Sequence, residues 1–207
     1  FLRQLEVPSA LHVHFNGAGS NIGAGKYNDG SKENRLILAK RLADGMKRAW
    51  DATEKYPLTA DAVGWNSVLV TLPTGPWLSR EGIEAGFQEQ PDPARILGSA
   101  SKLAWLERQE SGHQFDIPCL SLGTARILHM PGELFVEYQL SEKKQRPDLF
   151  VAMAAYGDYS PGYIGTAVAY EQGGYETSEA ASNVAPEVEG VLMGAVKQLL
   201  GGPPSAE

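Results

Sequence analysis

Glu133 is the carboxylate in this sequence whose surroundings best suit a functional site. It follows Met130-Pro131-Gly132, at the end of a segment predicted to be a strand and just before a predicted helix. Side chains at such strand-to-helix corners tend to project into the sites of α/β proteins. The alternative is that Glu133 only stabilises the positive end of the following helix, by less than about 1 kcal/mol. The sequence alone leaves both interpretations open.

The second chemically distinctive stretch runs from Tyr156 to Glu176 and is rich in tyrosine and glycine. A phenol donates or accepts hydrogen bonds, and a nearby cation can lower its pKa so that it binds as an anionic oxygen. The same composition is also typical of aromatic surface loops and oligomer interfaces. The stretch is therefore either a wall of a site or an interface. It holds five of the eight tyrosines of the chain, namely Tyr156, Tyr159, Tyr163, Tyr170 and Tyr175.

A glycine-rich segment from Asn16 to Gly25 fails the tests for nucleotide binding. Counted from Gly17, the sixth position of a dinucleotide-binding motif holds Ile22 instead of glycine. A Walker-type loop would need a glycine where the chain has Ser20 and a hydroxyl side chain of serine or threonine where it has Tyr27. The glycines are therefore expected to allow positive φ angles, or to let the backbone approach a ligand or a neighbouring strand closely.

The histidines do not have the four-residue helical spacing of zinc proteases. His12 and His14 share one face of a predicted strand, so they are either metal ligands or cross-strand packing residues. His129 stands four residues before Glu133 and is expected to line the same pocket.

Composition limits the class of protein. The 207 residues are 43% hydrophobic, which suits one substantial core. The net charge of −7 and the scattered 18 Lys and Arg residues argue against binding to a phosphate backbone. No apolar run approaches the roughly 20 residues of a membrane-spanning helix. Cys119 is the single cysteine and cannot form an internal disulfide. The chain opens at Phe1 without a leader, so any targeting signal was removed or never included.

The hydrophobic patterns predict an α/β (mixed α+β) layered domain with a mixed sheet covered by helices. We expect residues 1–200 to form a single globular unit and residues 201–207 a flexible tail. The helix from about residue 32 to 54 should place a stripe of Leu38, Leu42, Met46 and Trp50 on the core. The expected strands are 11–15, 63–72, 117–130, interrupted at Gly123, and 149–155; the other expected helices are 80–88, 93–109, 134–145 and 185–200.

Taken together, the two distinctive stretches resemble the C-terminal half of the catalytic domain of neutral/alkaline (non-lysosomal) ceramidases. The resemblance rests on Pro131-Gly132-Glu133, on Tyr163-Ile164-Gly165-Thr166, on Tyr170 and on Tyr175-Glu176, in that order and spacing. It covers roughly residues 11 to 30 and 117 to 200. The chain would then be part of a larger catalytic domain.

The resemblance implies that Glu133 and Tyr163 are zinc ligands, and it gives Tyr163 a catalytic role. The family's two histidine ligands would lie upstream of residue 1, on the missing half of the domain or on a partner chain. The family's catalytic serine aligns with Gly23, because its motif matches Gly19 to Gly25 best. The substrate-binding residues expected on this basis are Asn21, Gly23, His129, Tyr159 and Tyr170.

Two functions follow from the resemblance. The first is a zinc-dependent hydrolase of an N-acyl amide or related lipid-like substrate, with water as nucleophile in place of the serine. The second is a catalytically inactive domain of the same fold that binds a lipid or glycan. The resemblance also implies a secreted or extracytoplasmic protein.

Overall fold

The structure is a computed structural model that describes residues 11, 13–23, 25–89, 92–157 and 161–201. The chain divides into two compact units. One consists of Phe1–Phe15 with Gly23–Thr59, and the other of Asn16–Ile22 with Ala60–Glu207. Among the described residues, no helix is both long and apolar enough to span a membrane.

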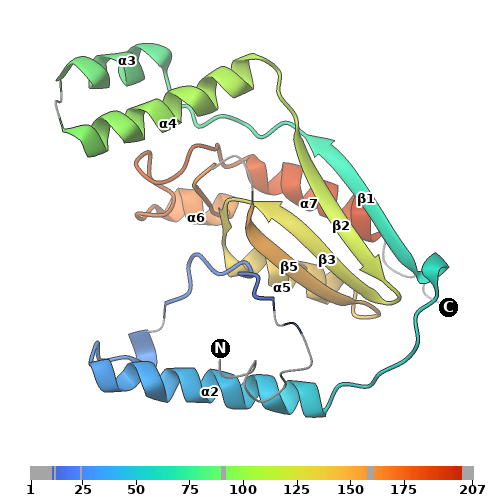
Figure 1. The fold of residues 1–207 in the computed structure, drawn as a ribbon. Helices are drawn as coiled ribbons and strands as arrows, with labels where there is room; N and C mark the ends of the chain where they lie inside the picture. The colour runs from blue at the N-terminus through green and yellow to red at the C-terminus, as the bar shows by residue number, and fades with distance from the viewer. Residues whose placement is uncertain (1–10, 12, 24, 90–91, 158–160, 202–207) are drawn as a thin grey trace. The chain divides into compact units, whose positions relative to one another are not determined.

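The larger unit is built on a four-stranded mixed sheet in the order β1-β2-β3-β5 (Figure 1). The strands are β1 (Val63–Val70), β2 (Phe115–Leu122), β3 (Ala125–Pro131) and β5 (Phe150–Gly157). Neighbours pair antiparallel from β1 to β3, whereas β3 and β5 are parallel. A parallel pair needs a crossover, which the helix α5 (Val136–Gln145) provides. The predicted mixed α/β class is confirmed.

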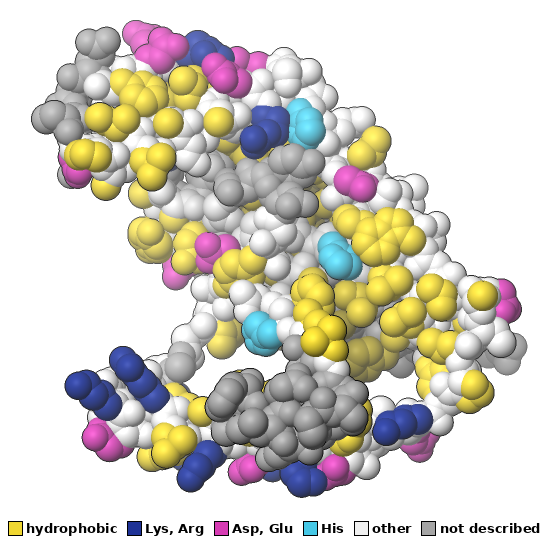
Figure 2. Space-filling view, in the orientation of Figure 1, with side chains coloured by type: hydrophobic (Ala, Val, Ile, Leu, Met, Phe, Trp, Pro, Cys, Tyr) yellow, Lys and Arg dark blue, Asp and Glu magenta, His cyan; other side chains and the backbone are white. Residues whose placement is uncertain are grey.

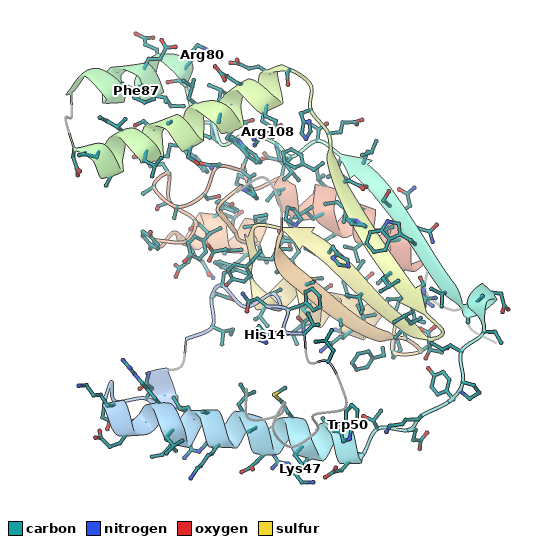
Figure 3. All side chains as sticks on the ribbon, viewed as in Figure 1. His14, Lys47, Trp50, Arg80, Phe87 and Arg108 are labelled. Carbon is teal, nitrogen blue, oxygen red and sulfur yellow. The ribbon has the colours of Figure 1, made fainter. Side chains whose placement is uncertain are left out.

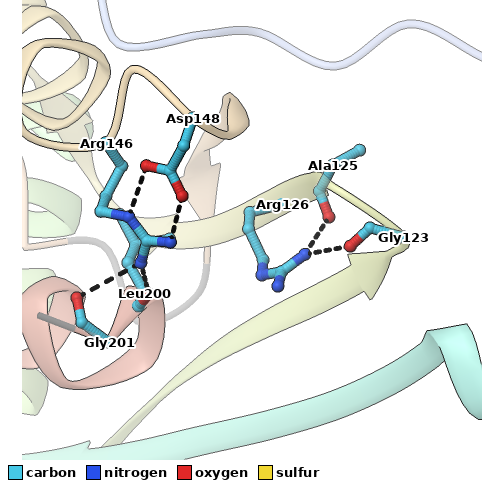
Figure 4. Close-up of polar contacts among 7 residues, drawn as sticks. All are labelled: Gly123, Ala125, Arg126, Arg146, Asp148, Leu200 and Gly201. Carbon is cyan, nitrogen blue, oxygen red and sulfur yellow. Dashed lines mark hydrogen bonds and ion pairs between the residues drawn. The ribbon is translucent and has the colours of Figure 1, made fainter. Parts of the chain in front are cut away.

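A tight turn joins β2 to β3, since Leu122 pairs with Ala125 across it. Gly123 supplies the positive φ of 57° that the turn requires. The Arg126 guanidinium donates to the carbonyl oxygens of Gly123 and Ala125, at 2.7 and 2.9 Å (Figure 4). The side chain thereby fixes the backbone that reverses the chain.

Helices α5 and α7 (Val188–Leu200) cover one face of the sheet. Side chains alternate along each strand, so the residues on this face are buried while their neighbours point to the other face. Leu128 and Met153 are register partners and belong to the core. From α7 the core receives Val188, Leu192, Ala195, Val196 and Leu200.

The end of α7 is held by Arg146, which follows α5. Its guanidinium donates to the carbonyl oxygens of Leu200 and Gly201 and forms an ion pair with Asp148, at 2.6 Å between Nη2 and Oδ2 (Figure 4). A cation is favourable at a helix C-terminus because the last carbonyl groups there lack partners within the helix. Arg146 therefore ties the two covering helices together.

The opposite face of the sheet carries exposed apolar side chains. Val63, Trp65 and Leu69 on β1 are 48%, 58% and 59% exposed, and Phe150 on β5 is 70% exposed. Figure 2 shows hydrophobic side chains gathered over these strands.

A helical pair, α3 (Arg80–Glu89) and α4 (Pro93–Glu110), is inserted between β1 and β2. Asp92 starts α4 by accepting a hydrogen bond from the Ala94 amide, and Pro93 occupies the first helical position. The Arg80 guanidinium, labelled in Figure 3, links the two helices through an ion pair with Glu110 of α4, at 2.6 Å.

Most predicted elements are confirmed, with ends shifted by a few residues. Helix α2 (Lys32–Asp51) ends three residues earlier than expected. The strand predicted at 11–15 is wrong for the described residues Leu11 and Val13–Phe15, which form no strand. The prediction that the α2 stripe is buried is wrong for Leu42, Met46 and Trp50, which are 65%, 44% and 40% exposed. The patterns missed the helix α6 (Ala167–Gln172) and two short strands, β4 (Glu133–Leu134) and β6 (Tyr163–Ile164).

Among the described residues of this unit, Glu142 on α5 is the buried carboxylate, with only 1% of its surface exposed. Its Oε1 atom has no hydrogen-bond partner among the described residues, and burial raises its pKa from 4.5 to about 7. The folded protein therefore binds more protons than the unfolded chain between these two pH values. Consequently its free energy of unfolding falls as the pH rises through that window.

We predict that Glu142→Gln removes this fall and raises the free energy of unfolding at alkaline pH by about 1–3 kcal/mol. Urea unfolding of both proteins, at about pH 5 and about pH 8, measures the effect. Glu187→Gln, at an exposed glutamate, serves as the control. An unchanged pH dependence in Glu142→Gln would contradict the prediction.

Candidate functional site

The candidate site is built on the short parallel pair of β4 and β6. Glu133 is the register partner of Tyr163, and Leu134 is the partner of Ile164. The Glu133 amide donates to the Gly162 carbonyl oxygen at 3.0 Å, and the Phe135 amide donates to that of Ile164 at 3.1 Å. Leu134 and Ile164 are fully buried. Because side chains alternate along a strand, Glu133 and Tyr163 project together on the side away from the core.

Two glycines make this pairing possible. Gly132 has a φ of +61°, and a Cβ atom there would lie 2.6 Å from Pro161 Cγ and 2.7 Å from the Gly162 carbonyl oxygen. Gly162 has a φ of +76°, and a Cβ atom there would overlap the Ala181 carbonyl oxygen. Any larger residue at either position would push the segments apart.

A β-bulge places a further tyrosine at the site. His129 pairs with Ala154 and Pro131 pairs with Gly157, so β5 contains one residue more than β3 over this interval. Tyr156 lies in the bulge with a φ of +62°, and its amide donates to the Gly132 carbonyl oxygen at 2.7 Å. Bulges of this kind redirect side chains and are common beside active sites. Tyr156 and Glu133 line the same pocket.

The charge of the Glu133 carboxylate raises the pKa of both phenols. Its negative charge is the largest cause of the raised pKa of Tyr163, and a hydrogen bond between the two side chains adds to it. Burial, followed by the same carboxylate charge, raises the pKa of Tyr156. The Tyr163 ring also meets the Tyr175 ring edge to face, with centroids 6.0 Å apart. An ordinary phenol, with a pKa of about 10, is already protonated at neutral pH, and the upward shifts keep both hydroxyl groups able to donate hydrogen bonds.

A pocket of about 390 Å³ opens beside Glu133. Gly132, Tyr156 and Gly162 form one side of it, and Ser101 and Lys102 of α4 contribute to another. The Lys102 ammonium donates to the Glu179 carbonyl oxygen at 3.0 Å. The pocket thus brings a carboxylate, a phenol and an ammonium group together. No sequence motif pointed to Ser101 and Lys102, because α4 comes from the insertion between β1 and β2.

Asn21 is not among the residues that line this pocket. Its Oδ1 atom accepts from the Val136 amide at the start of α5, and its Nδ2 atom donates to Glu137, both at 2.9 Å. It therefore caps α5, and it lines a second pocket of about 510 Å³ together with residues of α6 and α7.

The other candidate residues are distributed as follows. The Tyr170 hydroxyl is bonded to the buried Ser182 hydroxyl at 2.8 Å, and its pKa is raised mainly by burial. The His129 ring lies against the Trp65 ring of β1, with centroids 5.4 Å apart and the ring planes tilted by 54°. Gly23 and His14 belong to the smaller unit. Tyr159 and His12 lie outside the described residues.

A metal ion would find two oxygen donors here, the Glu133 carboxylate and the Tyr163 phenol. Their chemistry fits zinc, which accepts carboxylate oxygen. Within the described part of the chain, no group of three or more His, Cys, Asp or Glu residues is arranged to hold a metal.

Comparison with known proteins gives weak structural similarities. No protein-family model matches the chain, and no curated protein sequence matches it. Neutral ceramidase from Pseudomonas aeruginosa is similar with a TM-score of 0.38 and 14% identity, over 67% of this chain and 27% of that one. A ceramidase complexed with C2 is similar with a TM-score of 0.33 and 16% identity, over 45% of this chain and 16% of that one. The chain thus spans about a quarter or less of the length of these two proteins.

We predict that Glu133→Gln lowers the pKa of Tyr163 toward the ordinary tyrosine value of about 10, because the substitution removes the adjacent negative charge. Absorbance titration of the phenolate band measures this, with Tyr163→Phe identifying the contribution of Tyr163. Glu187→Gln should leave the titration unchanged. If Glu133→Gln also leaves it unchanged, the two side chains do not face each other in solution.

Proposed function

We propose that this chain contributes Glu133 and Tyr163 to the metal site of a ceramidase-like, zinc-dependent hydrolase. The substrate would be an N-acyl amide or a related lipid-like molecule. The observation that supports the proposal most directly is the register pairing of the carboxylate and the phenol on β4 and β6. The Pro-Gly-Glu and Tyr-Ile-x-Thr segments, which resemble those of ceramidases, supply the two paired residues.

Glu133 and Tyr163 would each give one oxygen ligand to the ion. The remaining ligands would be the two histidines that the resemblance implies, on an upstream segment or a partner chain. A bound zinc ion would supply an activated water molecule and would polarise the substrate carbonyl group. The positive charge of the ion would offset the negative charge of Glu133, which is the main cause of the raised pKa of Tyr163.

The chain's own residues would bind and orient the substrate beside Glu133. The Tyr156 phenol is protonated at neutral pH, as an ordinary phenol is, and can donate to a carbonyl or amide oxygen. Lys102 would attract negative charge at the rim of the pocket. Gly23 offers no hydroxyl at the position of the family serine, so water would be the nucleophile.

The alternative function is a binding domain of the same fold without turnover. The observation in its favour is again Gly23, which removes the hydroxyl group of the resembled family. Such a domain would keep the pocket beside Glu133 and bind a lipid or glycan there. An extracytoplasmic location is part of the proposal under either function, whereas a lipid-like substrate belongs to the hydrolase alone.

We predict that the chain binds Zn²⁺ in equilibrium dialysis and that Glu133→Gln or Tyr163→Phe weakens this binding about 10-fold or more. Each substitution removes one of the two oxygen ligands while conserving the size of the side chain. Glu187→Gln should bind as much zinc as the wild-type chain. Unchanged zinc binding in Glu133→Gln would refute the ligand assignment.

A turnover assay separates the two functions. The zinc-loaded wild-type chain, supplied with imidazole to provide nitrogen ligands, is tested on a panel of N-acyl amides and esters. A hydrolase should release product at a rate that falls about 100-fold or more in Glu133→Gln. Retained binding of the panel without any product favours the binding domain.

A further inference from the structure

Helix α2 (Lys32–Asp51) carries a stripe of apolar side chains along one side. This stripe is largely exposed. Leu38, Leu42, Met46 and Trp50 recur every four residues and therefore follow one another along one side of the helix. Leu42, Met46 and Trp50 are 65%, 44% and 40% exposed, and Leu36 is 59% exposed. Ala43 is the one buried residue of α2 among those whose burial is described. An apolar stripe of this length is costly to leave in water.

Helix α2 as a whole is basic. The helix contains six Lys and Arg residues and three Asp and Glu residues, which gives it a formal charge of +3, whereas the whole chain carries −7. Figure 2 shows the basic side chains distributed along α2, and Figure 3 marks Lys47 and Trp50 on its C-terminal half. The charge of α2 therefore has the opposite sign to that of the rest of the protein.

Cations also adjoin the aromatic end of the stripe. The Lys47 ammonium pairs with Asp51 at 2.5 Å, and the Lys55 ammonium lies 4.7 Å from the centre of the Trp50 ring. Long basic side chains can lay their methylene groups along apolar surface while their charges stay in water. Trp50 is of the residue type that gathers at the boundary between lipid headgroups and acyl chains.

We propose that α2 docks on the surface of a lipid bilayer that contains anionic headgroups. The helix lies parallel to the membrane, with Leu42, Met46 and Trp50 toward the acyl chains and its lysine and arginine residues at the headgroups. Charge complementarity selects this occupant, because basic residues near an apolar stripe match anionic lipid. A nucleic acid would engage the basic side alone and leave the stripe exposed. The proposal is independent of the metal site and its chemistry.

The experiment is vesicle co-sedimentation of the full chain. Vesicles of phosphatidylcholine alone are compared with vesicles in which about a third of the lipid is phosphatidylglycerol. We expect binding to the anionic vesicles at least about 10-fold tighter than to the neutral ones, and weaker binding as salt is added. Equal binding to both kinds of vesicle, or binding to neither, overturns the proposal.

Matched variants test the contributions of the apolar stripe and of the basic residues of α2 separately. Leu42→Gln with Met46→Gln removes apolar contacts but retains helix propensity, so it should lower binding about 10-fold or more. Lys40→Glu with Arg48→Glu should abolish the preference for anionic vesicles. Leu97→Gln is the control, because Leu97 on α4 is 73% exposed, and it should bind like the wild type. Circular dichroism verifies that each variant is folded.

A second measurement locates the helix. Vesicles with brominated acyl chains should quench the tryptophan fluorescence, and Trp50→Phe should remove most of that quenching. Quenching that persists in Trp50→Phe overturns the proposal, as does unchanged vesicle binding in the Leu42 and Met46 double variant. Binding to a DNA duplex that depends on Lys40 and Arg48 but not on Leu42 would assign α2 to nucleic acid instead.

Discussion

Glu133 and Tyr163, thirty positions apart, lie side by side because Gly132 and Gly162 let two backbone segments approach closely. Both glycines have positive φ angles, and neither position has room for a Cβ atom. The resulting β4–β6 pair is short, yet Leu134 and Ile164 anchor it in the core. The rest of the candidate site depends on this approach, because the same turn at Gly132 also receives the amide of Tyr156. The burial of Leu134 and Ile164, together with the lack of space for a side chain at Gly132 and Gly162, thus sets the geometry of the pocket beside Glu133.

Tyr156 has a strained backbone conformation that the surrounding structure must stabilise. A non-glycine residue in the left-handed region costs roughly 1–2 kcal/mol. Here the cost is offset by hydrogen bonds on either side of the bulge, from the Ala155 amide to the Asn16 carbonyl oxygen at 2.8 Å and from the Tyr156 amide to Gly132 at 2.7 Å. Strained residues of this kind cluster at functional sites. The glycine-rich segment that begins at Asn16 therefore serves the site through its backbone.

The sequence predicted what depends on periodicity and missed what depends on contacts between distant segments. Strands β1, β2, β3 and β5 each have at least seven residues, enough for the two-residue period to be visible. Strands β4 and β6 have two residues each and leave no pattern. At 11–15 the alternation was real, but the described residues of that segment, Leu11 and Val13–Phe15, form no strand.

The sequence motifs assigned Glu133 and Tyr163 to one predicted site. The structure places the two residues as neighbours on β4 and β6. Their role as zinc ligands stays a prediction. Lys102 and Ser101 could not be found, because the approach of α4 to the site is a tertiary contact without a local signature. The bulge at Tyr156 was equally invisible, since it is defined by the register of two strands.

The insertion of α3 and α4 between β1 and β2 also affects the order in which the strands pair during folding. Strands β2 and β3 can pair across a two-residue turn, and α5 carries the chain directly to β5. In contrast, β1 must find β2 across more than forty intervening residues, from Val70 to Phe115. Closing that loop costs chain entropy before the eight residue pairs of the ladder can repay it. Strand β1, with its exposed Trp65 and Leu69, is thus the last strand expected to join during folding, and until it joins, the edge of β2 is open to other chains.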